Sequence, residues 1–283
     1  MNWRDALRHL AHDRLTLAAA AIILLFVVLA LGGDALSAAL GVSASRVDLP
    51  HRFEPPSGAH LLGTDDFGRD QLSRLLQGAR VSLGVGTLAA LITLGVGASL
   101  GMVAAMYAGW ADDLFTWLVN TMRSIPALFF LLIVATVFRV GPLGLAVIIG
   151  LTSWMGASRL VRGQTLEVKA QEFINAARAI GASDRRVLVR HVAPNLVPIV
   201  AVLLGIDVGQ AILRESALSY LGLGIQPPDA SWGSMLTNAQ AYFSRAPWLV
   251  IVPGAAITVI VWSLYAIGDG LRDALDPRIT RRA

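Results

Sequence analysis

The chain has no cysteine, a single lysine and few charged residues. Charged residues make up 15% of its 283 residues and hydrophobic residues 55%, whereas a soluble domain averages about 25% and about 45–50%. Without cysteine there is no disulfide framework, thiolate metal site or cysteine nucleophile. The lysine, Lys169, is not part of a G-x-x-x-x-G-K-[ST] motif, so no phosphate-binding P-loop is expected. These absences argue against a soluble enzyme and against a nucleotide-hydrolysing chain.

Six stretches of the sequence are long and apolar enough to cross a bilayer. Each has at least 19 residues and at most one charge, and a helix rising about 1.5 Å per residue then reaches across the about 30 Å hydrocarbon core. Because helices satisfy their own backbone hydrogen bonds in lipid, we expect an all-α polytopic membrane protein with six transmembrane helices. The expected spans are Leu15–Gly33, Val81–Ala108, Leu114–Phe138, Val140–Ser158, Val192–Leu213 and Ala246–Gly268.

The distribution of basic residues predicts the orientation. If the N-terminus lies inside, the inner segments hold 15 of the 23 Lys and Arg residues, in agreement with the excess of positive charge on cytoplasmic loops. Both termini are then cytoplasmic. The first span also fits a signal peptide, but its apolar run exceeds the usual about 7–15 residues, so we expect it to be retained. The expected parts are residues 1–33 with the first span, an extracytoplasmic segment 34–80, and a core 81–283 containing an inner loop 159–191 and an outer loop 214–246.

The inner loop 159–191 carries the most informative pattern. Residues 164–180 alternate apolar and charged side chains as an amphipathic helix does, and Gly181 is placed to end that helix. Ser183 or Asp184 can cap a second helix, which we expect to end at Pro194. Two short helices at an angle suit docking to a soluble partner, although an ordinary solvated loop whose arginines set topology fits the pattern equally well.

Other polar residues have simpler interpretations. Asp65, Asp66 and Asp70 do not have the spacing of a calcium loop, and we expect a capped turn leading into a helix that starts at Gln71. Asp207 lies inside the fifth span, where a carboxylate is costly and by default functional. It either lines a translocation path or reaches water near the outer mouth or pairs with Arg214. Two G-x-x-x-G pairs, at residues 97 and 101 and at residues 205 and 209, predict close helix packing.

The inner loop resembles the EAA loop of ABC-importer permeases. More closely, the chain resembles the dipeptide, oligopeptide and nickel permease family, in its C-type subunit. Two departures are Asn175, where the EAA motif has glutamate, with Glu172 one turn earlier, and Ala193, where it has leucine. The resemblance rests on residues 62–74 (LGTDDFGRD before LSR), 175–194 (NAARAIG, nine residues, then HVAP), 215–233 (ESALSYLGLG, then PP and SWG) and 268–278 (GDGLRD, then LDPR).

This resemblance implies a type I importer core and a set of partners. These are a second, homologous permease forming a heterodimer, two ABC ATPase subunits and an extracytoplasmic solute-binding protein, in a bacterial inner membrane. It implies no cofactor in this chain, with ATP and Mg²⁺ on the ATPases, and no nucleic-acid partner. The expected ATPase-coupling surface comprises Glu172, Asn175, Ala176, Ala177, Gly181, His191 and Pro194.

The expected function is therefore that of a non-catalytic permease subunit that imports di- or oligopeptides by alternating access. Nickel, glutathione or another small solute are alternative cargoes in the same family. A proton-coupled secondary transporter is the alternative from another class, but it should carry several intramembrane ionisable residues, and Asp207 is the main one in this sequence.

Overall fold

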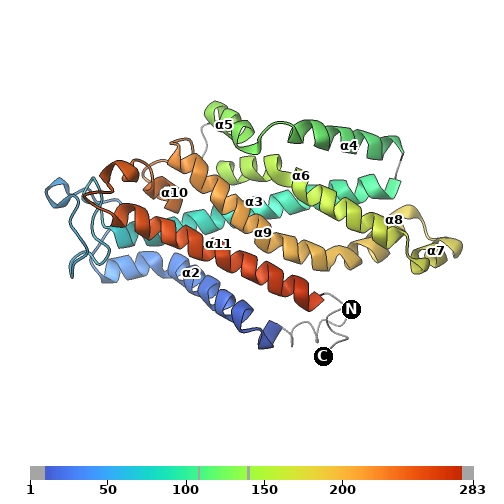
Figure 1. Ribbon diagram of the computed structural model, residues 1–283, viewed down its shortest axis with the longest axis horizontal. Coiled ribbons are helices and arrows are strands. Elements are labelled where there is room, and N and C mark those ends of the chain that lie inside the picture. The colour runs from blue at the N-terminus through green and yellow to red at the C-terminus, as the bar shows by residue number, and fades with distance from the viewer. Residues whose placement is uncertain (1–9, 108, 139–140, 276–283) are drawn as a thin grey trace.

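The computed structural model describes residues 10–107, 109–138 and 141–275. These residues form helices and turns with no β-strand, so the expected all-α fold class is confirmed. Five long helices run lengthwise through the molecule, with α10 at one end and α7 and α8 at the other (Figure 1). The helices are α2 (Arg14–Ala39), α3 (Gln71–Tyr107), α4 (Trp110–Arg123), α5 (Ala127–Val137), α6 (Pro142–Lys169), α7 (Glu172–Ala179), α8 (Asp184–Val187), α9 (Ala193–Tyr220), α10 (Trp232–Met235) and α11 (Trp248–Leu275); a π-helical turn covers Leu188–Val192, and 3₁₀ turns cover Leu49–His51 and Ala239–Tyr242.

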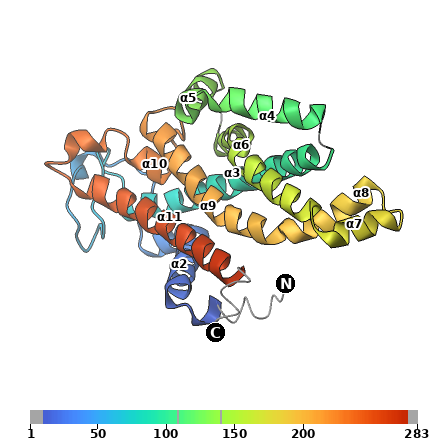
Figure 2. The same cartoon turned by 45° about the vertical axis from the view of Figure 1, so that its right-hand side comes forward.

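Five of the six expected spans are continuous helices of sufficient length and hydropathy: α2, α3, α6, Asp184–Tyr220 and α11. The prediction of a continuous third span is wrong. It is broken into α4 and α5, which meet at 82°. Pro126 lies at the break as the N-cap of α5, and a proline disfavours helical backbone in the residue before it. The pair α4–α5 lies along one side of the bundle in both views (Figures 1 and 2).

Glycines allow the long helices to approach one another closely. A Cβ atom at Gly101 would lie 2.4 Å from the carbonyl oxygen of Ser158 on α6. A Cβ atom at Gly205 would lie 3.1 Å from the carbonyl oxygen of Leu264 on α11. Side chains larger than hydrogen would therefore separate α3 from α6 and α9 from α11. The packing role predicted for both G-x-x-x-G pairs is confirmed.

The segment before α3 folds through its acidic residues. Asp70 Oδ1 accepts a hydrogen bond from the Ser73 backbone N–H at 2.8 Å, so Asp70 caps α3. Asp65 accepts bonds from the Phe67 and Arg69 backbone N–H groups, both at 2.9 Å. No cluster in the described part of the chain has the composition of a metal site. The predicted capped turn is confirmed, and α3 begins at Gln71 as expected.

Candidate functional site

The two short helices α7 and α8 project from one end of the molecule (Figure 2). The sequence predicted one helix over residues 164–180, and this is wrong, because α6 ends at Lys169 and α7 begins at Glu172. The Lys169 ammonium donates to the carbonyl oxygens of Ala105 at 3.0 Å and Met106 at 2.9 Å. It thereby fixes the end of α6 against the end of α3, and the chain turns before α7 starts.

Gly181 ends α7 as the sequence predicted. Its φ of +88° lies in the left-handed region that favours glycine. The Gly181 N–H bonds to the Arg178 carbonyl at 2.9 Å, and the Ala182 N–H bonds to the Ala177 carbonyl at 3.0 Å. This pair of bonds is the Schellman motif. An ion pair of 3.0 Å between Arg178 and Asp184 also crosses the turn, so the angle between α7 and α8 is held by several contacts.

One face of α7 is buried against the rest of the protein. Ile174 is fully buried and Ala177 is nearly so. Ile174 belongs to a core cluster that includes Val161 of α6 and Val187 of α8. Ala177, expected on the partner-facing surface, is instead buried. Ile174 therefore joins α7 to an apolar core shared with α6 and α8.

Two large apolar side chains near the two ends of α7, which sequence reasoning did not assign to the site, are exposed. Ile180 is 88% exposed and Phe173 is 45% exposed. They are seven residues apart, close to two helical turns, so they lie on one side of the helix. That spacing was readable in the sequence. Four of the expected coupling residues are also exposed, namely Glu172, Asn175, Ala176 and Gly181.

His191 and Pro194 join this region to the long helix α9. The half-buried His191 ring lies 6.5 Å, centroid to centroid, from the ring of Phe173. Pro194 was expected to end the second helix, and this is wrong, because the helical path is continuous over Asp184–Tyr220. Pro194 lies at the start of α9, directly after the π-helical turn Leu188–Val192. Proline within a helical path leaves one i→i−4 hydrogen bond unmade, and π-helical turns commonly occur as single-turn irregularities inside α-helices.

Near its other end, the same helix carries a buried carboxylate that sequence reasoning did not single out. Glu215 is fully buried, and it accepts hydrogen bonds from Ser219 at 2.7 Å and from Ser82 of α3 at 3.1 Å. The Ser82 hydroxyl also accepts a bond of 3.2 Å from the Trp232 backbone N–H. Glu215 therefore connects α9, α3 and the segment containing α10. The sequence placed it in an outer loop beginning at residue 214, whereas α9 extends to Tyr220.

Asp207 lies between the two ends of this helical path. One of its oxygens, Oδ2, is buried and has no hydrogen-bond partner within the described residues. Arg214 is two turns away along α9, and the two side chains form no direct ion pair among the residues that the structure describes. The geometry thus leaves the carboxylate of Asp207 unneutralised by direct contact.

The chain is similar to known transport proteins over most of its length. A family model described as "Binding-protein-dependent transport system inner membrane component" matches residues 97–281. The chain is 36% identical to a dipeptide transport system permease protein of Alkalihalophilus pseudofirmus, over 98% of this chain and 90% of the relative. It is 35% identical to a glutathione transport system permease protein of Pectobacterium atrosepticum, over 98% and 91%. It is 32% identical to an oligopeptide transport system permease protein of Bacillus subtilis, over 99% and 90%.

Proposed function

The chain belongs to the family of binding-protein-dependent transport system inner membrane components, and we propose that it is a permease subunit of an ATP-driven importer of di- or oligopeptides. Names of relatives support peptides as the cargo, and glutathione is the cargo named for another relative. Nickel or another small solute remains an alternative cargo from the sequence resemblance. Proton-coupled transport, the alternative from another class, predicts uptake that needs no ATP.

The observation that carries this proposal is the exposed face of α7. Phe173 and Ile180 present exposed apolar surface on the same short helix as the exposed Asn175 and Ala176, while the buried Ile174 anchors the helix to the core. Exposed apolar side chains with polar neighbours are typical of surfaces that bind another protein. We assign the partner as an ABC ATPase subunit, which binds ATP and Mg²⁺, and assign no cofactor to this chain.

The proposed stroke follows from the connections of α7. When ATP draws two ATPase subunits together, a groove on one of them moves α7. Because α7 packs on α6 and α8, and α8 continues into α9, these helices move as one body. A cavity between this permease and a homologous partner permease would then open to each side in turn, with cargo delivered by a solute-binding protein. In this proposal Asp207 lines the path, and Glu172, Gly181, His191 and Pro194 belong to the coupling region.

The same proposal sets the orientation in the bacterial inner membrane. The end of the molecule with α7 and α8 faces the cytoplasm, and the end with α10 faces outward. Helix α2 begins, and helix α11 ends, toward the α7 end (Figure 1), which supports cytoplasmic termini. The division into residues 1–33, 34–80 and 81–283 follows this orientation, with a coupling loop 159–191 and an outer loop 214–246. Residues 1–9 and 276–283 of these parts lie outside the described residues.

The test is a bulky side chain at Gly181 in the reconstituted importer. Nothing lies within 4 Å of a Cβ atom built at Gly181, so Gly181→Trp keeps the protein's own packing and obstructs a partner. We expect assembly to persist and ATP hydrolysis to continue, while peptide uptake falls at least tenfold. Gly41→Trp is the matched control, because Gly41 has a φ of +70° and the same open space, but ends α2 with its own Schellman bonds. Equal uptake by both variants would refute the coupling assignment.

A second substitution separates coupling from helix-cap strain. Ile180→Asp leaves Gly181 unchanged and replaces a side chain that is 88% exposed, so the stability of the permease should be unaffected. We expect weaker binding of the ATPase and slower uptake, because a charge would be buried in an apolar contact. Unaltered ATPase binding by Ile180→Asp would contradict the assigned surface. Uptake by the unmodified importer without ATP would contradict the proposed function itself.

A further inference from the structure

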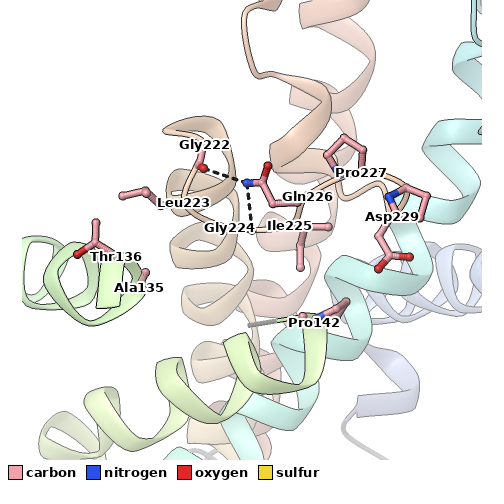
Figure 3. A pocket seen from close by; sticks show the side chains of 12 residues that line it. Ala135, Thr136, Pro142, Gly222, Leu223, Gly224, Ile225, Gln226, Pro227 and Asp229 are labelled. Carbon is pink, nitrogen blue, oxygen red and sulfur yellow. Dashed lines mark hydrogen bonds between the residues drawn. The ribbon is translucent and has the colours of Figure 1, made fainter. Parts of the chain in front are cut away.

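A cavity of about 660 Å³ lies at the α10 end of the molecule, between α5, α6 and the loop that follows α9. Its volume falls within the about 300–1,000 Å³ of typical ligand pockets. Figure 3 shows Ala135 and Thr136 of α5 on one side, Pro142 at the start of α6, and residues 222–229 of the loop on the other. The cavity therefore separates the end of α9 from the neighbouring helices α5 and α6.

The loop side of this cavity carries one carboxylate and is held by hydrogen bonds of its own. The side-chain amide of Gln226 donates to the carbonyl oxygens of Gly222 at 2.9 Å and Gly224 at 3.4 Å, which fixes the loop (Figure 3). Asp229 supplies the one ionisable side chain among the lining residues. No lysine, arginine or histidine of the described residues forms an ion pair with it. A carboxylate without an ion-pair partner among the described residues is complementary to a cation that donates hydrogen bonds.

A second cavity, of about 710 Å³, shares Pro142 and Asp229 with the first. Apart from Asp34, Gln77 and Arg80 its lining is apolar or glycine, contributed by α3 and α6: Val81, Gly84, Val85, Leu88, Leu143 and Ala146. Asp229 therefore lines both cavities, and the second combines apolar side chains with the ion pair of Arg80 and Asp34. A ligand that places a cationic group beside an apolar chain would satisfy both.

The wall that carries Asp229 is attached to α9. Gly222 ends α9 with a φ of +77°, its N–H bonding to the Ser219 carbonyl at 3.0 Å. The Ile225 N–H bonds to the Ser219 hydroxyl at 2.9 Å, and that hydroxyl also donates to Glu215. The loop is therefore attached to α9 and should move with it, whereas α5 forms the opposite wall of the cavity. Movement of α9 relative to α5 would change the width of the cavity.

We propose that Asp229 binds the α-ammonium group of an incoming peptide, with the first side chains of that peptide in the adjoining apolar cavity. The assignment rests on the proposed function as a peptide permease and names the subsite at which the cargo first contacts this chain. A free amino terminus beside an apolar residue combines the two chemistries that meet at Asp229. The carboxylate acts by binding and orienting the cargo, while selection among peptides stays with the solute-binding protein.

The experiment uses the complete importer in liposomes, with its solute-binding protein saturated by an apolar dipeptide. We expect Asp229→Asn to lower the uptake rate about tenfold, the effect of losing one hydrogen bond to a charged group. Asp229→Glu should recover most of the rate. Asp48→Asn is the control, because Asp48 pairs with His51 at 3.0 Å and lies in neither cavity lining. A dipeptide lacking the amino group should be carried at equal rates by the wild-type protein and Asp229→Asn.

The outcomes are distinguishable. Absence of peptide uptake by the wild-type importer would refute the proposed function, whatever Asp229 does. Wild-type uptake together with an unaltered rate in Asp229→Asn would refute this subsite alone. An equal loss for peptides with and without the amino group would make Asp229 a structural residue and also overturn the assignment. A loss seen in liposomes containing phosphatidylethanolamine, but not in phosphatidylcholine, would assign the carboxylate to a lipid ammonium group instead.

Discussion

Ser82→Ala tests whether the Glu215 contacts hold three segments together. The substitution deletes one oxygen atom, which donates to Glu215 at 3.1 Å and accepts from the Trp232 N–H at 3.2 Å. A hydrogen bond to a charged group contributes about 1.5–3 kcal/mol, and a buried donor left without a partner costs about 1–3 kcal/mol. We expect the free energy of unfolding to fall by about 2–4 kcal/mol, because part of each loss is recovered by local relaxation.

A matched control exists on α11. Ser263 is as fully buried as Ser82, but its hydroxyl donates to the Val259 carbonyl of its own helix at 2.8 Å. Ser263→Ala removes the same atom without disconnecting any segment, so its effect should be about 0.5 kcal/mol or less. The assay is reversible unfolding of the purified chain in mixed detergent micelles, followed by circular dichroism. A difference below about 0.5 kcal/mol between the two variants would refute the reasoning.

Glu215→Gln completes the test. An amide of nearly the same shape can still accept one hydroxyl bond, so Glu215→Gln should lower the free energy of unfolding by less than Ser82→Ala does. In the double variant the two effects should add less than fully, because both substitutions alter the Ser82–Glu215 hydrogen bond. Strict additivity would mean that the Ser82 hydroxyl stabilises the protein through Trp232 and not through Glu215.

Two further substitutions test the packing of the bundle. Gly101→Leu should reduce the folded, monodisperse fraction in detergent, since even a Cβ atom there would lie 2.4 Å from a carbonyl oxygen of α6. Gly95→Leu is the control and should leave that fraction unchanged, because nothing lies within 4 Å of a Cβ atom at Gly95. Equal yields of the two variants would contradict the observed approach of α3 to α6. Asp112→Asn should lower the free energy of unfolding by about 1 kcal/mol, because it disrupts the two hydrogen bonds of 2.6 Å between Asp112 and Arg162. The same denaturation assay measures this effect, and an unchanged free energy of unfolding would mean that the Asp112–Arg162 pair contributes nothing to stability.

The features that the sequence predicted well depend on local chemistry. An apolar run in lipid must become a helix, because nothing else satisfies its backbone, and five spans follow from that rule. Gly181 was predictable because the left-handed conformation it adopts is costly for other residues. The capping role of Asp70 follows from its place before Gln71 in the same way. In each case the decisive contact lies within a few residues along the chain.

The features that could not be predicted from the sequence depend on contacts between residues far apart along the chain. Burial of Glu215 requires Ser82, which is 133 positions away, and Trp232, whose N–H reaches Ser82 across 150 positions. The break before α7 depends on the reach of Lys169 to the end of α3. The break between α4 and α5 was concealed for a different reason. Averaged hydropathy passes over the single residue Pro126, although a proline removes one backbone hydrogen bond from a helix.

The helical path from Asp184 to Tyr220 is long enough to link the proposed coupling region and the proposed cargo subsite in one continuous element. Its 37 residues extend about 55 Å at 1.5 Å per residue, well beyond the about 30 Å hydrocarbon core. One end carries α7 through the Gly181 turn, and the other carries Glu215 and the loop to Asp229. A long lever of this kind transmits displacement only where its ends are held. The buried Ile174 contacts hold one end, and the Ser82–Glu215 bond holds the other. Weakening the Ser82–Glu215 bond should therefore impair uptake more than it impairs ATP hydrolysis.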